Sequence, residues 1–324
     1  MRWIAIAALS ALSAWGLVAC GDTPSANDEG TEQMAELTPI RDVWNFGDPA
    51  ASEEAFRALA AEAEAAGNDT YAAEAMTQVA RTFSLRGEFD QANAILDVVD
   101  EGPQGSVPVV RVRSLLERGR TLNSGGDRVA ALPLFEEAYE IAAANGEDFL
   151  AGDALHMAGI AADIDGERQW VGVLSDFVEG DPVNPATYWF GAMHNNLGWS
   201  YMSADRFEEA LTEFQASRDA YAAMDGKRYE TLIADYSVGQ AMRRLGRCEA
   251  ALPLQEQTFE AIRTEFEQDD EYVAEEIALC RAALGDTDGA REPAALAFEK
   301  FSAQSWFVES EADRLEALRE LAGR

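Results

Sequence analysis

Few side chains in this sequence could carry out chemistry, and they do not gather along the chain. The only two histidines, His156 and His194, are 38 residues apart. A metal ion in a protein usually needs three or four ligands in a fixed geometry, and no cluster of cysteines and histidines supplies them. Acidic pairs such as Glu136 and Glu137 suit a solvated helix face better than a catalytic dyad. The sequence therefore predicts no metal, no cofactor and no catalytic residue, and it predicts histidines at helix interfaces.

The three cysteines fall into two groups. Cys20 ends an apolar N-terminal run, whereas Cys248 and Cys280 lie far along the chain. In the repeat described below, Cys248 starts one helix and Cys280 lies late in the next, so the two could meet. Two interpretations stay open. One is a disulfide across 31 intervening residues, adding about 3 kcal/mol in an oxidising compartment, and the other is two small buried apolar residues that never touch.

An internal repeat positions these residues. Ala92, Ala131, Ala210, Ala251 and Ala290 each precede a helical run, with gaps of 39, 79, 41 and 39 residues. Because 79 is two steps of about 39 and 40, the period is near 40, which is typical of one helix pair per unit. The sequence Ala-Ala-Leu-Pro-Leu at 130–134 recurs at 250–254, three periods later, and supports the same register.

The spacing within each unit has a steric cause. The clearest unit reads HNNLGWSY at 194–201, then RFEEAL at 206–211, then Phe214. On the first helix, a large residue, a small one and a second large one face one side, and a Gly near the turn ends the helix. Small residues on both helices let two backbones approach closely, while the large ones fill the grooves beside them.

This pattern resembles the tetratricopeptide repeat family over about residues 70–297. The family's basic unit has about 34 residues, whereas these units run 39 to 41, so longer helices are expected to absorb the difference. The third unit, near 153–177, departs further, because its small position falls on or near Trp170. The resemblance implies an all-α fold, an α-solenoid of about six helical hairpins, and the alternative is another kind of helical hairpin array.

Two flanking segments are predicted to be N- and C-terminal capping helices. Residues 52–66 form an amphipathic stretch, with Ser52 as a start signal after Asp48 and Pro49. Residues 309–322 carry a leucine stripe. End repeats need such caps because an open end would expose a core face to water. The repeat array with its caps is therefore predicted to occupy residues 46–324.

The N-terminus has the features of a targeting signal. A short basic start precedes an apolar run at 3–18, too short to cross a membrane comfortably, and the run ends Leu17-Val18-Ala19-Cys20. This resembles a bacterial lipoprotein signal, which implies that residues 1–19 are removed and that Cys20 is acylated and anchors the chain. The alternative is an ordinary secretory signal in which Cys20 is a coincidence.

Residues 20–45 are predicted to be an acidic disordered tether, because their composition cannot bury a core. In bacterial lipoproteins, which the N-terminus resembles, an Asp directly after the acylated cysteine favours the inner membrane. Here that position is Gly21. The predicted location is therefore the periplasmic face of a bacterial membrane, the outer membrane being favoured over the inner.

The chain has a formal net charge of −34. Such a surface repels nucleic acid and anionic headgroups, so we expect no nucleic-acid partner. Solubility explains the acidity most simply, and affinity for basic partners or divalent cations is the alternative.

By family resemblance, the first helix of each unit lines a groove at offsets of minus three, plus one and plus four from its small residue. The predicted groove residues at these offsets are Thr77, Arg81, Ser84, Leu116, Arg120, Asn123, Asn195, Trp199, Met202, Tyr236, Gln240 and Arg243.

This set contains no carboxylate, although the chain as a whole is acidic. Arginine forks recognise carboxylates, and amides can bond a peptide backbone. The groove is therefore predicted to hold an extended or helical protein segment, including one that carries an acidic group or a free C-terminus. The alternative is that Trp199 and Tyr236 pack between helices and that the arginines pair with neighbouring acidic residues.

The leading hypothesis is a non-enzymatic, lipid-anchored scaffold that binds a protein partner in this groove at the cell envelope. The alternative is a sensory or nutrient-binding lipoprotein, with a small ligand between the middle repeats near His156, Trp170 and Trp199. An enzyme is the least supported class, because function must come from a site and none is visible.

Overall fold

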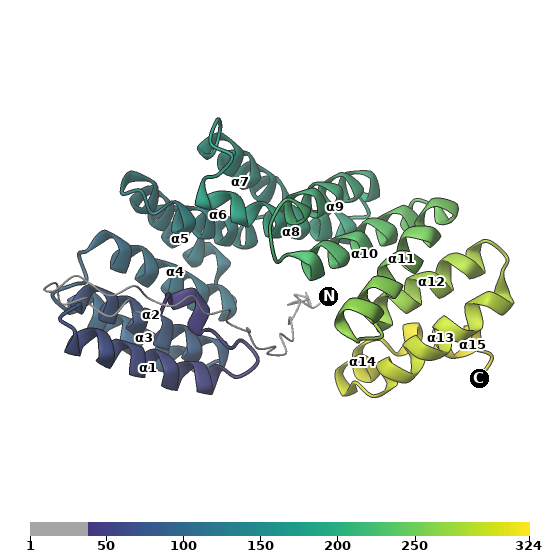
Figure 1. The fold of residues 1–324 in the computed structure, drawn as a ribbon, viewed down its shortest axis with the longest axis horizontal. Helices are drawn as coiled ribbons and strands as arrows, with labels where there is room; N and C mark the ends of the chain where they lie inside the picture. Colours follow the sequence, from purple (N-terminus) through teal and green to yellow (C-terminus); the bar gives the residue numbers. More distant parts are fainter. Residues whose placement is uncertain (1–37) are drawn as a thin grey trace, which may run out of the picture. The chain divides into compact units, whose positions relative to one another are not determined.

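In a computed structural model of the chain, residues 38–324 are described, and all their regular elements are helices (Figure 1). The described residues divide into two compact units, 38–161 and 162–324. No helix among the described residues is long and apolar enough to cross a membrane. The predicted signal peptide and Cys20 lie outside the described residues.

The first unit is a stack of helical hairpins. Each helix packs on the one that follows it, and the first helices of successive hairpins, α2 with α4 and α4 with α6, also touch. Its elements are η1 (Ile40–Val43), α1 (Pro49–Ala65), α2 (Asp69–Leu85), α3 (Phe89–Glu101), α4 (Pro108–Ser124), α5 (Arg128–Ala144) and α6 (Asp148–Ala161).

The second unit repeats this arrangement. Consecutive helices from α8 to α13 pack on one another, α10 touches α12, and α15 packs on α13. Its elements are α7 (Ile164–Phe177), η2 (Pro185–Trp189), α8 (Phe190–Ser203), α9 (Phe207–Ala222), α10 (Arg228–Arg244), α11 (Cys248–Phe266), α12 (Glu271–Ala283), α13 (Thr287–Ser302), α14 (Ser305–Ser310) and α15 (Ala312–Leu321).

The predicted fold class is confirmed: an α-solenoid built from helical hairpins with capping helices at both ends. Five of the six predicted hairpins correspond to α2–α3, α4–α5, α8–α9, α10–α11 and α12–α13. The predicted third repeat, whose register was the least regular, covers α6 and α7, which belong to different units. Helices of 17 residues in α2, α4 and α10 account for the long period.

Small residues lie where two helices of a hairpin cross. The five alanines that define the period, from Ala92 to Ala290, are completely buried. On the first helices, a Cβ added to Gly119 would lie 2.4 Å from the Phe135 ring, and one added to Gly198 would lie 2.5 Å from the Phe214 ring. The predicted close approach is therefore real, and in both hairpins the facing ring lies 16 residues further along the chain.

The N-terminal cap differs from the prediction in where it starts. Helix α1 begins at Pro49, because the Asp48 side chain accepts a hydrogen bond from the Ala51 backbone N–H at 3.0 Å and serves as the N-cap. Ser52 is not the start signal. It is buried inside α1, where its hydroxyl donates to the Asn45 carbonyl oxygen at 2.9 Å and accepts from the Asn45 N–H at 2.8 Å.

Residues 38–45, the end of the predicted tether, are folded onto the first hairpin. Ile40 is buried in the same apolar cluster as Phe56, and Trp44 packs against that cluster. Tyr71, in the first turn of α2, donates its hydroxyl proton to the Thr38 carbonyl oxygen. The prediction of disorder is therefore wrong for residues 38–45, because the aromatic and aliphatic side chains at its end do bury a core face.

The C-terminal cap is two helices rather than the single one predicted over 309–322. Helix α14 ends at Ser310 and α15 begins at Ala312, with Glu311 between them outside helical geometry at φ −125° and ψ 33°. The leucine stripe lies as expected, with Leu318 buried and Leu315 and Leu321 packed on the same cluster.

We expect Gly198→Ala to destabilise the second unit by about 1–3 kcal/mol, because the new methyl group would overlap the Phe214 ring. Urea denaturation followed by far-UV circular dichroism measures the change. The control is Gly172→Ala in α7, where an added Cβ meets nothing within 4 Å and alanine should raise stability by up to about 1 kcal/mol. Equal effects at the two sites would contradict the crossing-point explanation.

Candidate binding surface

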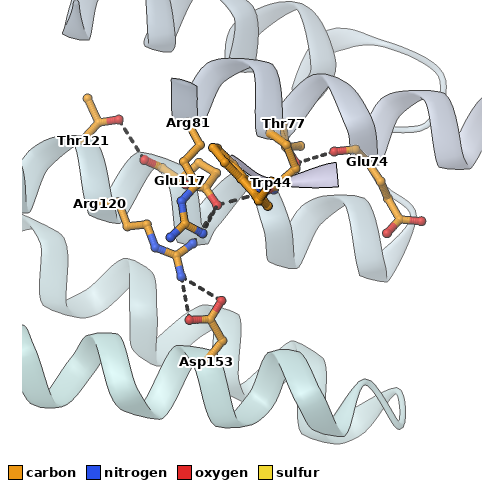
Figure 2. Close-up of polar contacts among 9 residues, drawn as sticks. Trp44, Glu74, Thr77, Arg81, Glu117, Arg120, Thr121 and Asp153 are labelled. Atoms are coloured by element: carbon orange, nitrogen blue, oxygen red, sulfur yellow. Dashed lines mark hydrogen bonds and ion pairs between the residues drawn. The ribbon is translucent and has the colours of Figure 1, made fainter. Parts of the chain in front are cut away.

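The two predicted groove arginines of the first unit, Arg81 and Arg120, lie in a cluster of alternating charges (Figure 2). Arg120 on α4 donates through Nη2 to both carboxylate oxygens of Asp153 on α6, at 2.6 and 2.7 Å. Through Nη1 it donates to Glu117 Oε1 at 2.6 Å, and Arg81 Nη1 on α2 lies 3.8 Å from the same oxygen. Two cations and two anions from three successive first helices thus neutralise one another.

Burial makes this cluster electrostatically strong. Glu117 is 1% exposed and Asp153 is 6% exposed. Burial raises the pKa of Asp153, but the positive charges of Arg120 and Arg81 outweigh it, and the pKa lies below its usual value. Burial lowers the pKa of Arg81, and the nearby Arg120 charge lowers it further. Arg120 is therefore already engaged by two carboxylates, which leaves it little capacity to grip a carboxylate of a partner.

Two aromatic rings from the N-terminal segment cover Arg81. The rings of Trp44 and Phe46 stack at a centroid distance of 4.8 Å, and the Arg81 guanidinium carbon lies 5.2 Å from the Trp44 ring centre and 5.5 Å from that of Phe46. Trp44 Nε1 donates to Gln78 Oε1 at 3.2 Å. Such cation–π contacts stabilise a guanidinium that has lost part of its hydration, so the chain itself occupies the approach to Arg81.

The other predicted groove residues of the first unit differ in their availability. Thr77, Ser84 and Leu116 are buried. Asn123, one turn beyond Arg120 on α4, is half-buried, and its amide makes no hydrogen bond to another described residue. In this unit Asn123 is the predicted groove residue whose polar group is best placed to bond a partner.

In the second unit the predicted groove residues of α10 are joined by a carboxylate from α12. Gln240 Nε2 donates to Glu276 Oε1 at 3.0 Å and to the Tyr236 hydroxyl oxygen at 3.1 Å. Arg243 Nη2 donates to the same Glu276 oxygen at 2.9 Å. Glu276 is 1% exposed and Tyr236 is 8% exposed, and burial raises the pKa of Tyr236 well above its usual value.

The predicted groove residues of α8 are not part of this network. Trp199 packs edge-on against Phe214, at a centroid distance of 5.2 Å, and lies against the apolar cluster that contains Tyr236. Met202 is buried. Asn195 is half-buried, and its amide makes no hydrogen bond to another described residue. The second unit thus brings together four predicted groove residues, Trp199, Tyr236, Gln240 and Arg243. Their rings and polar side-chain groups make contacts within the protein.

The carboxylates Glu117, Asp153 and Glu276 were absent from the predicted set. A signal for two of them exists in the sequence: Glu117 and Glu276 each lie two residues before the small residue of their helix, Gly119 and Ala278. That offset was not among the three inferred from the family. Asp153 lies in the irregular third repeat, where no register could be assigned.

The two histidines occupy separate environments. His194 Nδ1 lies 2.6 Å from Glu213 Oε2 on the neighbouring helix α9, and burial lowers the pKa of His156 to about 4. No group of three metal-binding side chains occurs among residues 38–324. His156 belongs to the first unit and Trp170 and Trp199 to the second, so the small-ligand alternative stays a prediction.

Cys248 and Cys280 lie in one apolar cluster in the second unit and are both buried free thiols. The alternative in which they never touch is therefore wrong, because the packing of α11 on α12 brings them together. The disulfide between them stays a prediction.

One part of the chain matches a known protein family. Residues 189–264, which run from the end of η2 through α8, α9 and α10 and nearly all of α11, match the family described as Tetratricopeptide repeat. This stretch is thus similar to the tetratricopeptide repeat family, in agreement with the resemblance of the sequence pattern. No curated protein matches the chain.

Several solved structures are similar to the chain. A tetratricopeptide repeat protein from Parabacteroides merdae has 13% identity and a TM-score of 0.46, over 88% of this chain and 97% of that chain. The nearly identical TPR-like repeats of a putative kinesin light chain from Podosopora anserina have 17% identity and a TM-score of 0.35, over 71% of this chain and 95% of that chain.

We expect Arg120→Met to destabilise the first unit by about 3–5 kcal/mol, because it leaves Glu117 and Asp153 buried without their main counter-charge. Arg41→Met is the control: Arg41 is 74% exposed in its side chain and pairs with Asp42 at the surface, so its loss should change stability by less than about 0.5 kcal/mol. Urea denaturation of both variants measures the difference. A loss below about 1 kcal/mol for Arg120→Met would show that the cluster is not a stabilising unit.

The lowered pKa of Asp153 predicts a loss of stability in acid. The unfolded chain takes up a proton at Asp153 near pH 3.9, whereas the folded chain does so only at lower pH. The stability that this carboxylate contributes is therefore present above the unfolded pKa and is lost as the pH falls through the folded pKa. Asp153→Asn should be less stable at neutral pH and should lose less stability between about pH 5 and 3.

Urea midpoints measured across this pH range compare the two chains. The exposed Glu140→Gln on α5 serves as the control and should follow the unmodified chain. A slope for Asp153→Asn equal to that of the unmodified chain would contradict the assigned role of Asp153.

Proposed function

We propose that this protein is a non-enzymatic, lipid-anchored scaffold of the bacterial cell envelope, and that it binds a protein segment along the first helices of its hairpins. The observation that carries the binding role is the tetratricopeptide repeat match over 189–264, because stacked hairpins of this kind present extended binding surfaces. The anchoring role is supported by the apolar N-terminal run that leads to Cys20, because this run is similar to a bacterial lipoprotein signal.

The contacts of the predicted groove residues narrow the chemistry of the partner. Arg120 and Arg243 are engaged by buried carboxylates of neighbouring helices, so partner carboxylates are not the main recognition element. The amides of Asn123 and Asn195 make no hydrogen bond within the described part of the chain, and an amide can both donate to and accept from a peptide backbone. The proposed partner is therefore an extended or helical segment recognised chiefly through its main chain.

The surroundings of this surface favour partners that are neutral or basic. The chain carries 59 acidic and 25 basic residues, and most arginines of the described part pair with a carboxylate. Like charges repel across an interface and slow association, whereas opposite charges steer it. An acidic partner would therefore bind this chain slowly.

Site-specific photo-crosslinking in the native envelope tests the binding role. A photoreactive residue placed at Asn123 or Asn195 should capture a discrete protein partner. The same residue at Gln215, an exposed position on the second helix α9, should not. Capture that is equal at Asn195 and Gln215, or absent at both groove positions, would contradict binding along the first helices.

The anchor is tested separately by metabolic labelling with a fatty acid. Label should appear on the full chain and disappear in Cys20→Ala, while the crosslinks at Asn195 with a purified partner should persist. A chain that carries no label would refute the anchor and leave the binding role standing.

A further inference from the structure

The two buried thiols of the second unit meet at the joint between two hairpins. Cys248 is the first residue of α11, the second helix of one hairpin, and Cys280 lies in α12, the first helix of the next. Cys248 is 5% exposed and Cys280 is fully buried. Both belong to a cluster with Ala251, and the side chains of Met242 and Leu252 pack against it.

The two side chains lie in the same buried cluster, at the place where α11 packs on α12. A disulfide requires two side chains that approach one another without movement of the backbone. The α11–α12 packing brings the two side chains into one cluster, which favours closure of the bond within the folded hairpins. No other cysteine occurs among residues 38–324, so neither thiol has a competing partner there.

We propose that Cys248 and Cys280 form a disulfide that staples α11 to α12 when the chain folds in contact with a disulfide oxidant. This inference does not depend on the proposed partner binding. It needs only an oxidant of the disulfide class, such as oxidised glutathione or the active-site disulfide of a thiol oxidase.

The reaction proceeds by two exchanges. The Cys248 thiol loses its proton, its sulfur attacks one sulfur of the oxidant, and the oxidant's S–S bond breaks to release one thiolate. The Cys280 thiol then loses its proton and attacks Cys248 Sγ, which forms the Sγ–Sγ bond and expels the second thiolate. The two protons end on the two released thiolates, so the cysteine pair is oxidised and the oxidant is reduced to two thiols.

Burial dictates when this happens. Cys280 is fully covered in the folded chain, and burial raises the pKa of its thiol, which suppresses the reactive thiolate. The bond should therefore form during folding, before α12 is covered by α13. Once formed, it should resist reductants until the second unit opens.

The staple would act beside the predicted groove residues of α10. Glu276, which holds Gln240 and Arg243, lies one helical turn before Cys280 on the same helix. Fixing α12 against α11 would therefore also fix the carboxylate that orients these two side chains.

The experiment uses the full chain with Cys20→Ser, which keeps only these two thiols. The chain is refolded from urea in a buffer of reduced and oxidised glutathione. Mass spectrometry under non-reducing conditions should then find it lighter by two hydrogen atoms, with one proteolytic fragment pair joined through Cys248 and Cys280. The melting temperature should exceed that of the reduced chain by roughly 5–10 °C.

The matched control adds Cys280→Ala to the same chain. It should retain one thiol or carry a single glutathione, and oxidant should not raise its melting temperature. The reduced, folded two-thiol chain should react with a maleimide at least tenfold more slowly than in urea. Two free thiols after refolding, or a crosslinked chain no more stable than the reduced one, would overturn the proposal.

Discussion

The fold depends on one steric constraint, the close approach of two helices at a residue with little or no side chain. At Gly119 and Gly198 a single methyl group would overlap an aromatic ring of the second helix, so the ring lies directly on the backbone of the first. In each of these hairpins, the two helices can approach this closely only because the first helix has no side chain at the crossing point. A small residue recurs at the equivalent place of other first helices, with Gly239 facing Gln255 and Ala80 packed with Leu96, so the close approach repeats although the facing side chain changes.

A second set of contacts joins one hairpin to the next. Arg120 with Asp153, and Arg243 with Glu276, each link the first helices of successive hairpins over 33 residues. Buried ion pairs of this kind contribute less to net stability than their strength suggests, because both partners lose their hydration. They are nevertheless strongly directional, and a slip of one turn between α4 and α6 would leave two charges buried and unpaired. We infer that they fix the register in which hairpins stack, while the apolar core supplies most of the stability.

The sequence predicts those features that allow only small residues. The alanines of the period and the glycines at the helix crossings are such positions, and the fold class and the long helices followed from them. Features that several residue types can satisfy were missed. Asp48 and Ser52 are both good N-caps, and only the hydrogen bond from Ala51 distinguishes them. Glu117 and Asp153 are ordinary acidic residues in a chain with 59 of them, and only the packing of α4 on α6 reveals which arginine they hold.

The segment before α1 is held on α2, and this attachment decides how the protein would respond to a pulling force. Thr38, Trp44 and Phe46 rest on α2 through Tyr71, Gln78 and Arg81, so a pull on anything attached upstream would be borne by these contacts before it reached α1. These contacts lie at the edge of the unit, where Phe46 is exposed, although Ile40 of the same segment is buried in the core cluster. Under such a load, the contacts at the outer edge of the first hairpin would open first, while the hairpins that follow keep their geometry.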